Sequence, residues 1–237
     1  MVEIRPRTGK LKMYYRELKH PVAHGAGHSY DSPPNTFLDE LVAWGMTAPD
    51  EIFESRDLNN SVYAAVFPVL GPYKDGLHRR AVMLEVMRVL AGYESAWKWT
   101  EGVDVHPQKE IKDATTSEAG AWQVSANSMN LARELKSLVM ARTGSDDGLK
   151  FQQSMKSDHA LAMEYIARLL RNTIKANGPV VRHTTEIDLS LRRDAVQEFI
   201  EILDPTDGNI KLFQGRFVAS IHLARVTNTP SSGLRVV

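Results

Sequence analysis

The sequence predicts a mainly α-helical protein, a bundle built around one buried central helix. Apolar residues recur every three or four positions in several long segments, as in helices packed on one face. Segment 77–93 has few polar residues and is apolar on more than one side, which is typical of a helix inside a core. The long polar loop 100–118 follows, and a small loop or β-hairpin region is expected there.

The flanking segments supply the other expected elements. Pro49 opens a short helical turn, and the apolar run 61–70 is either a core helix or a short strand. Residues 36–44 form an amphipathic helix whose apolar face consists of Phe37, Leu38, Leu41 and Trp44. Later helices are expected over 125–142, 158–176 and 189–203, with a last helix or strand over 215–226.

Length and composition are those of a soluble globular protein. The chain has 237 residues, of which 43% are hydrophobic and 24% are charged. No composition break marks a linker, and no internal repeat is present. We expect an N-terminal extension over residues 1–70, partly helical, and one compact domain over residues 71–237.

Charge and cysteine content exclude several classes of function. Lys plus Arg and Asp plus Glu both number 29, so the basic surplus of a nucleic-acid-binding protein is missing. The absence of cysteine excludes a disulfide, a thiol nucleophile and a cysteine-based zinc site. His20, His24 and His28 could share a helix face and hold a metal, but the Pro and Gly residues between them favour a solvated loop. No metal or cofactor is expected.

The distribution of apolar and charged residues also bears on localisation. No run of about 18 apolar residues occurs, so membrane insertion is not expected. Residues 1–20 carry charges throughout and lack the apolar core of a secretory signal. We therefore expect a chain made in the cytoplasm that reaches an extracellular substrate only through lysis or a specialised secretion machine.

Glu94 is the candidate catalytic residue. It lies at or just past the last turn of the expected central helix, next to Tyr93 and Trp97. Glycoside cleavage needs a proton donor at the leaving oxygen, and burial beside aromatic rings keeps a carboxylic acid protonated near neutral pH. The alternative is a solvated glutamate, which the dipole at a helix C-terminus disfavours slightly.

Two short motifs carry a family resemblance. Tyr93-Glu94-Ser95, followed 29 positions after Glu94 by the glutamine of Gly120-Ala121-Trp122-Gln123, resembles goose-type lysozymes and soluble lytic transglycosylases of the lysozyme-like superfamily. Those families place Glu-Ser at the end of a buried helix and a G-L-M-Q segment before the next. Here Ala121-Trp122 stands in place of Leu-Met. The later helix with Tyr165 is similar too, and Asn177 takes the place of a final Tyr-Asn motif without its tyrosine, so the resemblance covers about residues 77–180.

The resemblance implies an α+β lysozyme-like fold and a set of residue roles. Glu94 would be the general acid/base, Gln123 would bind a sugar or its N-acetyl group, and the backbone at Gly120 would approach the substrate closely. Trp97, Trp99 and Trp122 would either stack on sugar faces or simply pack in the core. The full expected substrate-binding set is Ser95, Trp97, Gly120, Trp122, Gln123, Tyr165 and Asn177.

A second carboxylate would decide the mechanism. An inverting hydrolase places one about 6.5–9.5 Å from the acid to activate water. The loop offers Asp104, Asp113 and Glu118, and the resemblance favours Asp113, then Glu118. If none faces Glu94, a transglycosylase follows, in which the substrate's own groups assist.

We therefore expect a glycosidase that cleaves the β-1,4 glycan strand of bacterial peptidoglycan, either a muramidase or a lytic transglycosylase. A phage lysin or an injected antibacterial effector would fit, and an inhibitor or immunity protein would then be a further partner. The alternatives are a glycosidase acting on chitin or chitosan, and a non-catalytic helical structural or interaction protein.

Overall fold

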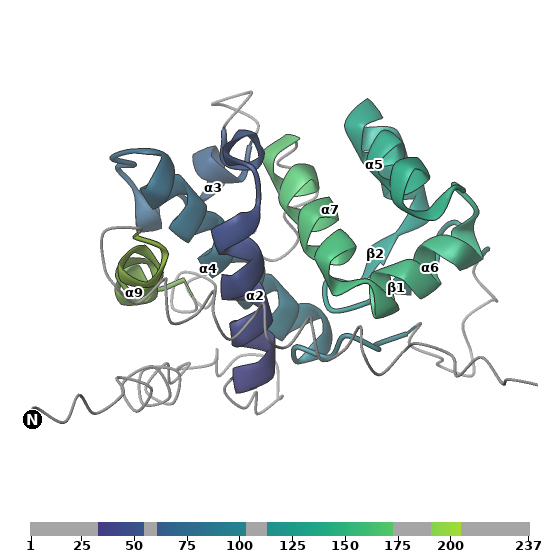
Figure 1. Cartoon of the computed structure of the whole chain (residues 1–237), viewed down its shortest axis with the longest axis horizontal. Helices are drawn as coiled ribbons and strands as arrows, with labels where there is room; N and C mark the ends of the chain where they lie inside the picture. The colour runs from purple at the N-terminus through teal and green to yellow at the C-terminus, as the bar shows by residue number, and fades with distance from the viewer. Residues whose placement is uncertain (1–32, 55–60, 103–112, 173–190, 205–237) are drawn as a thin grey trace, which may run out of the picture.

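The computed structural model describes residues 33–54, 61–102, 113–172 and 191–204 (Figure 1). Helices make up 71% of these residues, and the sheet within them has two antiparallel strands. The mainly α-helical class is thus confirmed. No helix in the described ranges combines the length and the apolar character that crossing a membrane requires.

Helix α4, Gly76–Ser95, is the centre of the molecule. It begins at Asp75, whose carboxylate accepts the backbone N–H of His78 at 2.7 Å, and every residue from 81 to 92 is buried. The expected helix over 77–93 is therefore present and buried. Helices α2 (Asn35–Thr47) and α9 (Arg193–Leu203) and the 3₁₀ turn η1 (Asp50–Phe53) all pack on it.

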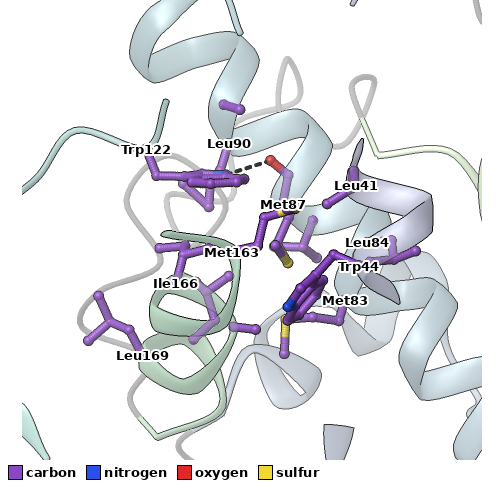
Figure 2. Close-up of a cluster of buried hydrophobic side chains, with 14 of the residues drawn as sticks. Leu41, Trp44, Met83, Leu84, Met87, Leu90, Trp122, Met163, Ile166 and Leu169 are labelled. Atoms are coloured by element: carbon purple, nitrogen blue, oxygen red, sulfur yellow. Dashed lines mark hydrogen bonds between the residues drawn. The ribbon is translucent and has the colours of Figure 1, made fainter. Parts of the chain in front are cut away.

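The core lies where α2, α4 and α7 (His159–Asn172) meet. Helix α3, Val62–Leu70, adds Val62, Tyr63 and Val66, so the open choice between helix and strand at 61–70 resolves as helix. Figure 2 shows this cluster, in which the labelled residues of the three helices are Leu41, Trp44, Met83, Leu84, Met87, Leu90, Met163, Ile166 and Leu169.

Strands β1 (Glu118–Ala119) and β2 (Val124–Ser125) form a short hairpin. Glu118 pairs with Ser125 and Ala119 with Val124, so the four-residue turn 120–123 closes the hairpin. The described strands thus flank the Gly-Gln turn, whereas the sequence placed a hairpin within loop 100–118. Residues 103–112 of that loop lie outside the described residues.

The helix predicted over 125–142 is interrupted. The structure has a 3₁₀ segment, η2 (Ala126–Leu131), then an extended Ala132, then helix α5 (Arg133–Thr143). Serine and asparagine side chains compete for the helical hydrogen bonds in this stretch. The hydroxyl of Ser128 donates to the carbonyl of Ser125 at 2.6 Å, which replaces regular helix pairing there.

Helix α6, Gly148–Ser157, was not predicted from the sequence. Asp147 caps it by accepting the N–H of Lys150, and Phe151 and Met155 pack inward. Helix α7 then begins at His159 and is described to Asn172, and α9 begins at Arg193 rather than 189. The expected last element, 215–226, lies outside the described residues.

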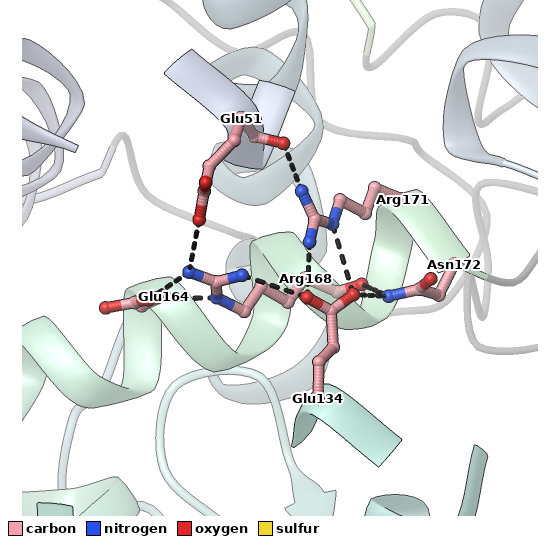
Figure 3. A network of polar contacts seen from close by, with 6 residues as sticks. All are labelled: Glu51, Glu134, Glu164, Arg168, Arg171 and Asn172. Atoms are coloured by element: carbon pink, nitrogen blue, oxygen red, sulfur yellow. Dashed lines mark hydrogen bonds and ion pairs between the residues drawn. The ribbon is translucent and has the colours of Figure 1, made fainter. Parts of the chain in front are cut away.

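A charged network joins α5, α7 and η1 (Figure 3). Glu134 of α5 accepts hydrogen bonds from Arg168 at 2.9 Å, and from Arg171 and Asn172. Arg171 also donates to the backbone carbonyl of Glu51 in η1. This network fixes α5 against the helical body and thereby supports η2 and the hairpin next to it.

Candidate functional site

Glu94 occupies the last turn of α4 and is partly exposed. The helix ends directly after it, because Ala96 adopts a left-handed conformation with φ 51° and its N–H returns to the carbonyl of Gly92 at 3.0 Å. Trp97 follows with φ 60°. The position of Glu94 agrees with the sequence expectation.

Backbone with positive φ follows Glu94 in the chain and also occurs in the hairpin turn. Among the described residues, the non-glycine positions with positive φ are Ala96, Trp97 and Gln123. A left-handed conformation is costly for an aromatic residue such as Trp97. Such strain persists only where the surrounding structure enforces it, and it gathers at functional sites. Here it marks the residues after Glu94 and the hairpin turn.

Ser95 holds these two segments together. Its hydroxyl lies 2.8 Å from the carbonyl oxygen of Ala121 and 3.1 Å from that of Ala91, and it accepts the N–H of Lys98 at 3.1 Å. Only 7% of Ser95 is exposed. The sequence proposed Ser95 as a substrate-binding residue. In the structure its hydroxyl is engaged with the protein and fixes the hairpin turn beside Glu94.

Two of the three candidate stacking tryptophans, Trp97 and Trp122, are core residues, and the third, Trp99, is partly buried against the core. Trp97 and Trp122 are 5% and 4% exposed, and each indole N–H donates to a carbonyl of α4 at 2.8 Å, of Arg88 and Met87 respectively. Gly92 makes room for Trp97, because a Cβ at that position would lie 2.7 Å from the indole ring. Of the two roles considered from the sequence, core packing is the one that this geometry fits.

Gly120 and Gln123 shape the turn itself. Gly120 has φ 77°, and a Cβ there would lie 2.7 Å from the carbonyl oxygen of Met155 in α6. Glycine is thus needed for packing on α6. The side-chain amide of Gln123 donates to the carbonyl of Gly120 at 2.8 Å and is partly exposed. Gln123 is therefore the polar side chain of this turn that a ligand can reach.

The structure gives different surroundings to the candidate second carboxylates. Asp113 is exposed and organises a turn, because its carboxylate accepts the N–H and hydroxyl of Thr115 at 3.3 and 3.0 Å. Glu118 is exposed at the start of β1, two residues before Gly120. Asp104 lies outside the described residues.

Tyr165 is placed beneath the site rather than at its surface. It is fully buried on α7, and its hydroxyl lies 2.6 Å from the hydroxyl of Ser128 in η2. Burial raises the pKa of Tyr165 to about 12, although the bond to Ser128 opposes the shift. Tyr165 therefore supports the segment that follows the hairpin. Asn177, the last candidate, lies outside the described residues.

The sequence did not point to a polar pair beside this region. Nδ1 of His159 lies 2.5 Å from a carboxylate oxygen of Glu40, and the imidazole stacks on Trp99 with ring centroids 3.9 Å apart and planes 9° apart. Trp99 in turn meets Trp122 edge-on at 5.4 Å. Glu40 and His159 are 119 positions apart, so no local pattern links them.

Metal ligation finds no support in the described ranges, where no cluster of three or more His, Asp or Glu side chains could hold an ion. The histidines at 20, 24 and 28 lie outside them.

Comparison with known proteins returns no relative: no protein-family model, no curated protein and no solved structure matches this chain. A function therefore has to be inferred from the residues around Glu94.

Proposed function

We propose that this protein cleaves the β-1,4 glycan strand of bacterial peptidoglycan, as a lysozyme-like muramidase or lytic transglycosylase with Glu94 as general acid/base. One observation carries the proposal. Glu94 lies in the last turn of the buried helix α4, before the left-handed residues Ala96 and Trp97, and the bond from Ser95 to Ala121 holds the turn that contains Gln123 against this helix end. A left-handed conformation is rare for a tryptophan, and backbone strain of this kind gathers at functional sites.

The chemistry asks for a carboxylic acid at a fixed position. Glu94 would protonate the glycosidic oxygen as the bond breaks, which an unperturbed Glu with a pKa near 4.3 does poorly at neutral pH. A rigid mounting matters as much as acidity, because a general acid must stay within hydrogen-bond reach of the leaving oxygen. The engaged hydroxyl of Ser95 and the anchored indole of Trp97 provide that mounting.

Gln123 would orient the substrate. Its partly exposed amide belongs to the turn that Ser95 fixes beside Glu94, so it is suited to hydrogen-bond a hydroxyl or an acetamido group of the glycan. Trp97, Trp122 and Tyr165 would act indirectly by holding the helix end, the turn and η2 in place.

In a hydrolase, Glu118 or Asp113 would activate the attacking water molecule. Both are exposed and lie on the chain leading into the hairpin. If neither assists, the substrate itself supplies the nucleophile and the product carries a 1,6-anhydro end.

Loss of turbidity in suspensions of purified bacterial cell walls tests the proposal. Glu94→Gln keeps the side-chain shape and removes the proton donor, so we expect activity to fall at least about 100-fold. Glu54→Gln, an exposed glutamate after η1, is the matched control and should act like the wild type. Equal activity of Glu94→Gln and the wild type would remove Glu94 from the mechanism.

Substrate and product tests then separate the alternatives. Mass spectrometry of the fragments identifies a hydrolase by a reducing end and a transglycosylase by a 1,6-anhydro end. Activity on chitin or chitosan, with none on cell walls, would reassign the substrate. A chain inactive on all three would be a helical structural or interaction protein.

A further inference from the structure

Glu40, His159 and Trp99 form a cluster whose arrangement fold stability does not explain. Glu40 lies on α2, His159 is the first residue of α7, and Trp99 lies in the segment after α4. The side chains of His159 and Glu40 are 31% and 38% exposed. An ion pair or hydrogen bond with that much exposure contributes little to stability.

The imidazole is held in a single orientation. The carboxylate of Glu40 engages Nδ1 at 2.5 Å, and the indole of Trp99 covers one ring face at a centroid distance of 3.9 Å. A carboxylate on one ring nitrogen fixes the tautomer and leaves the other nitrogen for a second partner. Within the described part of the chain, Nε2 of His159 has no hydrogen-bond partner.

Aromatic contacts connect this imidazole to the Glu94 site. Trp99 comes five residues after Glu94, and its ring packs on Phe37 at 5.0 Å and on Trp122 at 5.4 Å. Trp122 directly precedes Gln123, and its indole N–H is anchored on Met87 of α4. Ring contacts therefore link His159, through Trp99 and Trp122, to the segment that follows Glu94 and to the residue before Gln123.

We propose that Glu40 and His159 form a saccharide-binding pair in the region of Glu94, in which Nε2 of His159 accepts a hydrogen bond from a hydroxyl group or an acetamido N–H of the glycan. The inference rests on the proposed glycosidase function and extends it by a second binding position. The indole ring of Trp99 stacks on one face of the imidazole and so supports it. Its ring is covered by His159 and bordered by Phe37 and Trp122, so it does not itself receive a sugar.

Steady-state kinetics on soluble, uncross-linked peptidoglycan strands tests the pair. His159→Phe keeps a ring to stack on Trp99 and removes both nitrogens. We expect KM to rise about tenfold, as for one lost hydrogen bond, while kcat stays within about threefold of the wild type. His159→Gln returns an amide near the position of Nε2 and should recover most of the loss. Glu40→Ala frees the imidazole and should raise KM severalfold.

The matched control is His78→Phe. His78 lies at the opposite end of α4, about 24 Å from Glu94 at a rise of about 1.5 Å per residue, and it packs edge-on to Tyr73. Its kinetics should equal those of the wild type. Thermal unfolding of every variant checks the fold.

Three results overturn the inference in distinguishable ways. An active wild type whose KM is unchanged in both His159→Phe and Glu40→Ala would leave the glycosidase proposal intact and assign this pair a structural role. A lower kcat at unchanged KM would also contradict a binding role. A wild type without activity on any glycan would contradict the proposed function, and it would also contradict saccharide binding by Glu40 and His159.

Discussion

The hydroxyl of Ser95 and the carbonyl oxygen of Ala121 lie 2.8 Å apart, and this bond joins the end of the central helix to the turn of the hairpin. It connects residues 26 positions apart, directly after Glu94 and two residues before Gln123. This buried hydroxyl therefore helps to set the relative position of the proposed acid and the proposed substrate-binding amide, together with the bond from Trp122 to Met87.

Ser95→Ala should weaken both the fold and the site. Removing the hydroxyl leaves the buried carbonyl of Ala121 without this partner, which costs about 1–3 kcal/mol of unfolding free energy. We expect lower kcat on cell-wall strands, because Glu94 and the turn are no longer held together. Ser154→Ala, which removes an exposed bond within α6, is the control and should change neither quantity by much. Unchanged kcat in a destabilised Ser95→Ala would limit Ser95 to folding.

Gly92→Ala should destabilise the end of α4. The added Cβ would lie 2.7 Å from the ring of Trp97, which is held by its bond to Arg88 and cannot easily move. Overpacking of this kind costs about 1–3 kcal/mol, measurable by chemical denaturation. Gly76→Ala in the same helix meets no atom within 4 Å and is the matched control. Equal stability of the two variants would mean that the indole ring of Trp97 moves to accommodate the added methyl group.

Glu134 should make the protein sensitive to acid. Burial raises the pKa of Glu134, but hydrogen bonds from Arg171, Asn172 and Arg168 outweigh it, so its pKa lies below the ordinary value of 4.5. A lowered folded-state pKa gives stability that is present above pH 4.5 and lost as pH falls through the folded value.

Glu134→Gln tests this by denaturation at two pH values. The variant should be less stable than the wild type at pH 7, by about 1 kcal/mol, because Arg168 and Arg171 each lose one charged partner in a partly exposed network. The difference should narrow toward pH 3, where the wild-type carboxylate is protonated too. A difference independent of pH would indicate that the shape of Glu134, and not its charge, is what matters.

Glu198 should make the stability of the protein depend on pH in the opposite direction. It is 3% exposed on α9, facing the buried pair Glu85 and Arg88 of α4, and its Oε1 has no hydrogen-bond partner in the described structure. Burial raises the pKa of Glu198 to about 8; Arg88 lowers it, while Glu85, Asp194 and Glu201 raise it further. Because the folded pKa exceeds the unfolded one, stability should fall between about pH 5 and 8 and then level off.

Glu198→Gln should flatten that profile. The slope removed is at most about 1.4 kcal/mol per pH unit, read from unfolding curves between pH 5 and 8. At pH 8 the variant should be the more stable protein, since it carries no buried charge at this position. Parallel profiles for the variant and the wild type would show that Glu198 does not titrate in this range.

The sequence anticipated the parts of the fold that repeat regularly. Helix α4 was predictable because its apolar residues continue over five turns, and α7 because its apolar stripe is unbroken. Helix α6 was missed because only Phe151 and Met155 provide an apolar signal, while Leu149 is 61% exposed. The break at Ala132 was missed because the apolar spacing continues across it, from Met129 to Leu135.

The candidate site, like the fold, could be predicted from the sequence only in part. The place of Glu94 at the end of a buried helix, and of Gly120–Gln123 in a turn, could be predicted from their local sequence. The hydrogen-bond partners of Ser95, Trp97 and Trp122 could not, because spacing does not show which carbonyl a hydroxyl or an indole N–H will reach. The contact between Glu40 and His159 exists only after α2 and α7 have packed.

The anchoring of Trp97 and Trp122 on consecutive carbonyls of α4 has a spectroscopic consequence. All four tryptophans of the chain lie in the described core or against it, with Trp44, Trp97 and Trp122 at most 8% exposed. Folded protein should therefore emit at short wavelength, with little quenching by iodide. A red shift would report loosening around Glu94 with no added label, so the fluorescence of the native chain can follow the same region in which catalysis is proposed.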